Sequence, residues 1–128
     1  MVKIAVASTD GKVVNQHFGR ADKFYILATD EDTADYFLDE LRNVNPVCHG
    51  GDHEEGQMEH AVNNLSDCHI VLVSRIGMRA RNEFERIGIE VFEIPQIIDK
   101  AVEQLICYRK VQKLFYEKEA GCCLNNKK

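Results

Sequence analysis

The chain has 128 residues, of which 45% are hydrophobic and 29% charged, a balance typical of one globular domain and unlike that of a disordered chain. No apolar run reaches the roughly 18–20 residues of a membrane span, and the first apolar stretch is too short for a signal peptide, so we expect a cytoplasmic protein without a membrane segment. The formal net charge is −5, whereas nucleic-acid-binding domains usually carry a basic surface, so no nucleic-acid partner is expected.

The chain contains five cysteines, Cys48, Cys68, Cys107, Cys122 and Cys123. An odd number in a chain without an export signal indicates reduced thiols, and the absence of a C-x-x-C pair gives no support to a zinc ribbon or a thioredoxin-type site. Cys68 opens an apolar run and Cys107 lies in a helical pattern, so we expect both to pack in the core. Cys122 and Cys123 stand in a polar tail, where disorder is the expected state.

Apolar periodicity predicts four strands, over residues 2–8, 23–29, 68–74 and 89–94. A fifth segment, residues 34–44, fits a strand and a helix equally well. Its content of Asp, Glu and Leu favours the helix. We interpret it as a strand because of the family resemblance given below.

Helical spacing of apolar residues predicts three helices, over residues 52–65, 78–87 and 97–106, and a less regular helical pattern continues to Glu119. The order is then three strands followed by alternating helices and strands. Such alternation makes the later strands parallel, while the first three form a meander. The expected architecture is one mixed sheet with helices on both faces.

Three loops are expected at one edge of this sheet, namely residues 9–20, 45–52 and 74–78. If the first strand points up, the third strand and the later parallel strands also point up. Open α/β sheets bind their ligands beyond the carboxyl ends of the strands. The topology therefore gathers the chemically active side chains of these loops, which are His17, Cys48, His49, Ser74 and Arg75.

The residues at this edge suit an anionic ligand that contains metal and sulfur. A thiolate and imidazoles are the ligands that borderline and soft metals and iron–sulfur clusters prefer. Gly50, Gly51 and Gly77 let a bulky group approach the backbone. Arg75, with the amides at the start of the next helix, attracts an anion.

Three motifs in these loops, set after an N-terminal KIAVAS, carry a resemblance to one family. They are VNQHFGRA at residues 14–21, VCHGG at 47–51 and VSRIG at 73–77. Together they resemble the dinitrogenase iron–molybdenum cofactor biosynthesis family, which includes the NifX-type carriers and the C-terminal domain of NifB. The resemblance implies a ribonuclease H-like α/β fold with a single five-stranded mixed sheet flanked by helices, and hence a strand over residues 34–44.

The resemblance also implies a carrier, not an enzyme, for an iron–sulfur or molybdenum–iron–sulfur cluster or its precursor. His17, Cys48 and His49 would be the metal ligands, and the glycines and Arg75 would complete the binding site. The expected partners are the cluster and cofactor-assembly proteins, with the oligomeric state left open. The family domain would span residues 1–107, and residues 108–128 would form a helical extension with a cysteine-containing tail.

Two features depart from the usual family pattern. Met78 follows SRIG where relatives often have a small residue or proline, and the extension lies beyond the family domain. Two other functions are therefore kept open. One is binding of a different metal–sulfur cluster outside nitrogen fixation, such as the molybdenum–copper cluster of the orange protein. The other is a protein-interaction module in which residues 108–115 dock a partner or a second copy.

Nuclease activity is not expected, although nucleases share this fold type. Two-metal nucleases need several carboxylates at the sheet. The predicted strands over residues 2–8 and 68–74 contain no Asp or Glu.

Overall fold

The computed structural model describes residues 1–44 and 57–125, with side chains described for residues 1–44 and 59–112. The elements in chain order are β1 (Val2–Ala7), the short 3-10 helix η1 (Phe18–Arg20), β2 (Lys23–Thr29), β3 (Tyr36–Asn43), α1 (Gln57–Asn63), β4 (Ile70–Val73), α2 (Met78–Arg86), β5 (Glu90–Glu93) and α3 (Ile98–Asn125). No helix in the described ranges combines the length and the apolar character that crossing a membrane requires.

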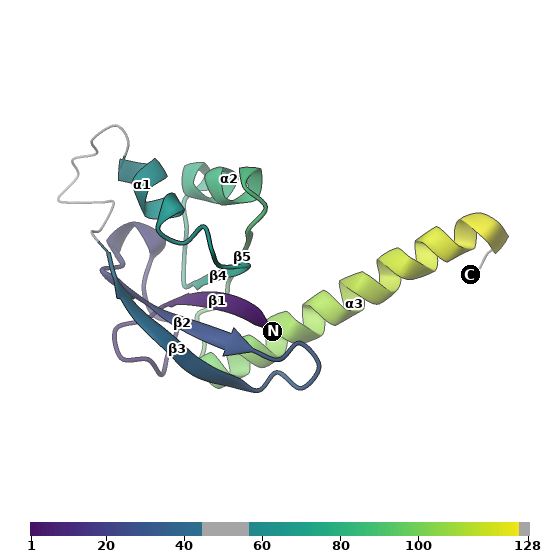
Figure 1. Cartoon of the computed structure of the whole chain (residues 1–128), viewed down its shortest axis with the longest axis horizontal. Helices are drawn as coiled ribbons and strands as arrows, with labels where there is room; N and C mark the ends of the chain where they lie inside the picture. The colour runs from purple at the N-terminus through teal and green to yellow at the C-terminus, as the bar shows by residue number, and fades with distance from the viewer. Residues whose placement is uncertain (45–56, 126–128) are drawn as a thin grey trace.

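The strands form one five-stranded mixed sheet in the order β3-β2-β1-β4-β5. β2 is antiparallel to both β1 and β3, whereas β4 is parallel to β1 and β5 is parallel to β4. The predicted fold class is therefore confirmed, including the strand expected over residues 34–44. Figure 1 shows α1 and α2 on one side of the sheet and α3 on the other.

β3 is an edge strand and is held mainly by its pairing with β2. Seven residue pairs join the two strands, with a bulge at Asp39 between the pairs Ile26–Glu40 and Leu27–Leu38. Arg42 adds a link to the segment before β4, because its guanidinium donates to the Asp67 carboxylate at 2.9 Å. A sequence of low strand propensity thus forms a strand because the neighbouring strand offers a complete row of backbone partners.

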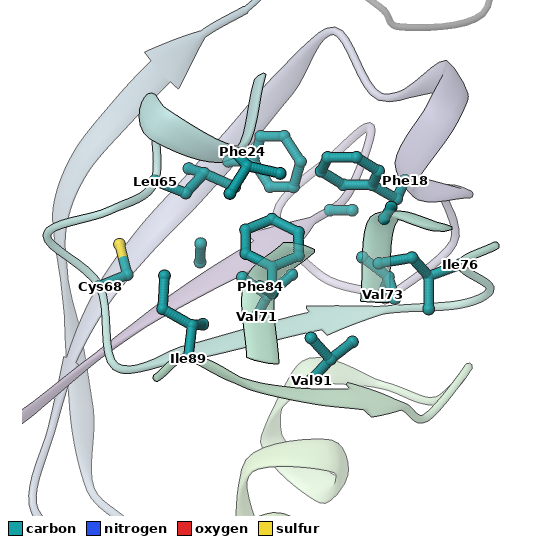
Figure 2. Close-up of a cluster of buried hydrophobic side chains, with 14 of the residues drawn as sticks. Phe18, Phe24, Leu65, Cys68, Val71, Val73, Ile76, Phe84, Ile89 and Val91 are labelled. Atoms are coloured by element: carbon teal, nitrogen blue, oxygen red, sulfur yellow. The ribbon is translucent and has the colours of Figure 1, made fainter. Parts of the chain in front are cut away.

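The sheet separates two apolar clusters. Side chains of β1, β2, β4 and β5 pack with Val62 of α1 and Phe84 of α2 on one face, shown in Figure 2. On the other face, β1 and β4 pack against α3, whose inward stripe consists of Ile98, Ala101, Val102, Leu105 and Ile106. Covering both faces leaves the ends of the strands as the exposed rim of the sheet.

Two expectations about α3 are wrong. The helix does not end near Glu119 but continues to Asn125, so Cys122 and Cys123 lie within it instead of in a disordered tail. Cys107 is exposed. It is one residue past the inward stripe, and a rotation of about 100° per residue turns it away from the sheet. The expectation for Cys68 is confirmed, since that thiol is buried in the cluster beneath α1 and α2.

Candidate functional site

The carboxyl ends of three strands meet at one edge, as predicted. The register pairs Ala7 of β1 with Phe24 of β2, and Phe24 in turn with Arg42 of β3. On the other side of β1, Val6 pairs with Leu72 of the parallel strand β4. The segments that follow β1, β3 and β4 therefore all start at the same rim.

The loop after β1 is folded back onto this rim by its own polar residues. Thr9 and Asn15 bind each other through two hydrogen bonds of 3.0 and 2.9 Å. The Asp10 carboxylate accepts hydrogen bonds from the amides of Lys12 and Val13, which lowers the pKa of Asp10. Gly11 has a φ of +76°, a conformation that glycine adopts easily. The Asp-Gly pair thus makes a turn that sends the chain back along the sheet edge.

The returning segment places His17 beside Arg75. The two residues form a parallel β-bridge, in which the Phe18 amide donates to the Arg75 carbonyl at 2.9 Å and the Ser74 amide donates to the Gln16 carbonyl at 3.1 Å. Backbones paired in this way lie about 4.8 Å apart. Both the His17 and Arg75 side chains are exposed. Two of the predicted site residues, 58 positions apart in sequence, are therefore neighbours at the rim.

Phe18 fixes the position of His17 from below. Its ring is buried and makes an edge-to-face contact with Phe84 of α2, at 5.2 Å between ring centroids. A second contact joins it to Phe24 of β2 at 6.1 Å, and Figure 2 shows the three rings side by side in the core. The residue that follows the exposed histidine is thus anchored in the core, which limits the movement of the backbone at His17.

Two polar atoms next to the bridge have no hydrogen-bond partner among the described residues. They are the Ser74 hydroxyl oxygen and Gln16 Oε1, and both atoms are inaccessible to solvent. Buried polar atoms without partners cost free energy, so such atoms at a rim favour a polar ligand. The sequence places Ser74 at this edge, but gives no sign that Gln16 is involved beyond its position before His17.

The segment between β4 and α2 leaves open space at Gly77. This glycine precedes the first turn of α2 with φ −75° and ψ 158°, and, apart from its chain neighbours, no atom of the described residues lies within 4 Å of the place where a Cβ would stand. The Ile76 amide donates to the Glu93 carboxylate at 3.0 Å, and Glu93 also pairs with Arg81. These contacts hold the start of α2 at the rim, and the other described residues leave space at Gly77.

Cys48, His49, Gly50 and Gly51 lie outside the described residues. The last described residue before them, Val44, has its amide bound to the Asp22 carbonyl at 2.9 Å, at the same rim. Among the side chains that the structure does describe, no group of three His, Cys, Asp or Glu residues is arranged to hold a metal ion. The structure therefore places three residues of the predicted site, His17, Arg75 and Gly77.

A separate hollow of about 780 Å³ lies along β5 between α2 and α3. Its lining includes Val91 and Phe92 of β5 together with Tyr108 of α3. None of the predicted site residues lines it, so it is distinct from the rim at His17 and Arg75.

The two described cysteines should differ in reactivity. Burial raises the pKa of the Cys68 thiol to about 11, whereas Cys107 is exposed on α3. Because the thiolate is the reactive form, we expect iodoacetamide to label Cys107 at least about tenfold faster than Cys68 in the native chain at pH 8. Mass spectrometry of the peptides measures both rates. Equal rates in the native chain would contradict this assignment, and denaturant should remove most of the difference.

The comparisons with known proteins identify the family. A family model described as dinitrogenase iron-molybdenum cofactor matches residues 1–107. The chain belongs to the dinitrogenase iron-molybdenum cofactor family. The resemblance seen in the sequence motifs is thereby confirmed.

Relatives within this family include proteins much longer than this chain. The chain is 39% identical over 108 residues to the FeMo cofactor biosynthesis protein NifB of Frankia alni, a match that covers 82% of this chain and 21% of that protein. It is 32% identical over 120 residues to the protein of the same name from Chlorobaculum tepidum, covering 94% of this chain and 27% of that protein. The match thus spans between about a fifth and just over a quarter of the length of these two relatives.

A solved structure shows the same fold. The apo form of the orange protein from Desulfovibrio gigas matches with a TM-score of 0.59 at 21% identity, covering 83% of this chain and 88% of that chain. At this identity the likeness concerns the fold alone.

Proposed function

We propose that this chain binds an iron–sulfur or molybdenum–iron–sulfur cluster, or its precursor, and passes it on during cofactor assembly without catalysing a reaction. The observation that carries the proposal is the β-bridge that sets His17 beside Arg75 at the rim of the sheet. In this proposal the cluster is cargo, and the partners are other cofactor-assembly proteins. Membership of the cofactor family supports the class of ligand.

The residues at the rim suit such a cargo chemically. An imidazole at His17 offers one metal ligand, and Cys48 and His49 would supply a thiolate and a second imidazole from the segment after Val44. The guanidinium of Arg75 favours the negative charge that a cluster with sulfide ligands carries.

The form of the site favours release as well as binding. A carrier must give up its cluster, so one to three protein ligands are expected in place of a closed cage of four. His17 is exposed, and the space above Gly77 is open. A cluster bound there would keep one side accessible to a recipient protein.

The test is reconstitution of the full chain with ferrous iron and sulfide under anaerobic conditions, with and without molybdate. We expect the wild type to retain a cluster after desalting, measured by visible absorption and by iron and molybdenum content. The triple variant H17A/C48A/H49A should retain at least about tenfold less metal, because the proposed ligands are gone. H60A is the matched control, since His60 is an exposed histidine in α1 that is not among the proposed ligands, and it should behave as the wild type.

Equal retention by the wild type and the triple variant would overturn the proposal, whether that retention is high or negligible. Copper and molybdenum added together serve as a second cargo. Preferential retention of that pair would replace the iron-containing cluster by one of the type kept open above.

A further inference from the structure

The outer edge of β5 carries free backbone groups. β5 is the last strand of the sheet, and its second edge pairs with no strand among the described residues. The amides of Glu90 and Ile94 donate to carbonyls on the β4 side, at 3.1 and 3.0 Å, so alternate residues of β5 face β4. The amides and carbonyls of Val91 and Glu93 therefore point away from the sheet. An extended segment can add to such an edge as a further strand.

The hollow of about 780 Å³ follows this free edge. α2 lines one side of the hollow with Arg81 and Glu85, and α3 lines the other side with Gln104 and Tyr108. The backbone of β5 lies between the two helices. A groove with a strand edge along its length and a helix on each side suits an extended polypeptide better than a compact ligand, because the polypeptide can use the free amides and carbonyls.

The α3 side of the hollow is apolar and aromatic. Phe92 of β5 and Tyr108 of α3 meet edge-to-face, with 5.7 Å between their ring centroids. The Tyr108 side chain is 50% exposed, and the buried Leu105 also lines the hollow. Side chains of a strand alternate between its two faces. Those of an added strand that are directed to this side should therefore be aliphatic.

The α2 side of the hollow carries charge. Val91 points to this side (Figure 2), and its carbonyl accepts a hydrogen bond from the Arg81 guanidinium at 3.3 Å. This bond is longer than the usual 2.9–3.0 Å, so the amide of an added strand can replace it. Arg81 also forms an ion pair with Glu93 at 3.0 Å. Glu85 is exposed and forms no ion pair with any residue that the structure describes, so its carboxylate is free for a basic side chain.

We propose that the free edge of β5 binds an extended segment of another protein, in which aliphatic and basic residues alternate. The segment adds to the sheet through the backbone groups of Val91 and Glu93. Its aliphatic side chains lie against Phe92 and Tyr108, and its basic side chains face Glu85. The backbone hydrogen bonds supply affinity, and the two sides of the hollow select the side chains.

The charges in the hollow favour such a segment over a second copy of this chain. Two β5 strands that pair antiparallel about a two-fold axis would repeat each side of the hollow, and would bring a second Glu85 to the α2 side. Among the described lining residues the only basic one is Arg81, and it is already bound to Glu93. A basic segment of a different protein meets no such repulsion.

Binding of short synthetic peptides to the full chain tests the proposal. The probe is a fluorescent peptide of sequence KVKVKVK, and EVEVEVE is its acidic counterpart. We expect saturable binding of the basic peptide, measured by fluorescence anisotropy, and an affinity at least about tenfold lower for the acidic one. The proposal is overturned if the basic peptide does not bind up to about 1 mM, or if the two peptides bind equally well.

Substitutions on the two sides of the hollow locate the bound peptide. E85K should lower the affinity for the basic peptide at least about threefold, and Y108S at least about fivefold, because each removes the contact on one side. E103K and L41S are the matched controls. Glu103 is exposed on α3 outside the lining of the hollow, and Leu41 is exposed on the opposite edge strand, so both controls should bind as the wild type. Equal weakening in variants and controls contradicts binding in the hollow.

Backbone measurements distinguish strand addition from other modes of binding. In the free chain the amides of Val91 and Glu93 should exchange with deuterium at least about tenfold faster than that of Phe92, and the basic peptide should slow both. Two N-methylated peptides, one methylated on every lysine amide and the other on every valine amide, should differ at least about tenfold in affinity, because only alternate amides of a strand face its neighbour.

Two results of these measurements overturn the proposal. One is equal affinity of the two methylated peptides, or amides of Val91 and Glu93 that stay unprotected at saturating peptide. The other is protection of these amides that rises with the concentration of the chain in the absence of peptide, because that result assigns the edge to a second copy.

Discussion

Replacing Phe84 by alanine should lower the free energy of unfolding by about 3–5 kcal/mol. Phe84 is fully buried in α2 and meets the Phe18 ring edge-to-face. The loss combines the transfer of the ring to water with the cavity left among rigid neighbours. Since a domain of this size is stable by only about 5–15 kcal/mol, this one change should remove a large part of the total. Urea unfolding followed by circular dichroism measures it.

The same variant should loosen the rim. Phe18 holds the backbone beside His17, and its amide is bound to the Arg75 carbonyl. We therefore expect faster hydrogen exchange at the Phe18 amide in F84A than in the wild type. F84L is the matched control, because it keeps most of the apolar volume and should lose no more than about 1–2 kcal/mol. A loss below 1 kcal/mol in F84A would mean that this aromatic contact does not anchor the loop.

Most of the fold follows from apolar patterning alone. β1, β2 and β4 are short runs of mostly buried residues, β5 buries Val91, and α2 and α3 show clear helical stripes. β3 is different, because most of its residues are exposed and its propensity is helical. A propensity describes a segment by itself, whereas β3 is decided by the free edge of β2 beside it. Only the family resemblance supplied that information before the structure did.

The site was predictable to the extent that topology determines it. Strand direction alone brings the segments after β1 and β4 together, and the structure pairs His17 with Arg75 there. The unpartnered atoms of Gln16 and Ser74 were not predictable, because hydrogen-bond satisfaction depends on packing details that no spacing rule contains. The roles of Cys48 and His49 stay a prediction.

The end of α3 shows a second limit of prediction from the spacing of apolar residues. The apolar stripe of α3 that faces the sheet ends at Ile106, and the residues after it follow a different line around the axis. A change of stripe can mean the end of a helix or a change of partner. Here the helix continues and Tyr108 still contacts Phe92 of β5, so the sequence signal marked the end of the fully buried stripe and not the loss of helical structure.

The substitution Gly77→Thr should reduce retention of the cluster without changing the stability of the fold. Its backbone is in the extended region that any residue adopts, and the described residues beyond its chain neighbours leave space around the position of the Cβ. Threonine is also a good residue before the first turn of a helix, since its hydroxyl accepts a hydrogen bond from an amide there. We therefore expect the free energy of unfolding to stay within about 0.5 kcal/mol of the wild type. Under the proposed function, retention of the reconstituted cluster should fall at least about tenfold.

Binding and stability should respond differently because the backbone conformation at this position does not require glycine. The free amides at the start of α2 and the empty space above Gly77 matter only if an anionic group approaches them. Threonine would fill part of that space and bind one of the amides. Gly77→Ala adds only a methyl group and should have a smaller effect, so metal retention should decline in the order glycine, alanine, threonine while the urea midpoint stays nearly constant. If all three proteins hold the same amount of iron, the cluster does not approach α2, and Arg75 must act on something other than the cargo.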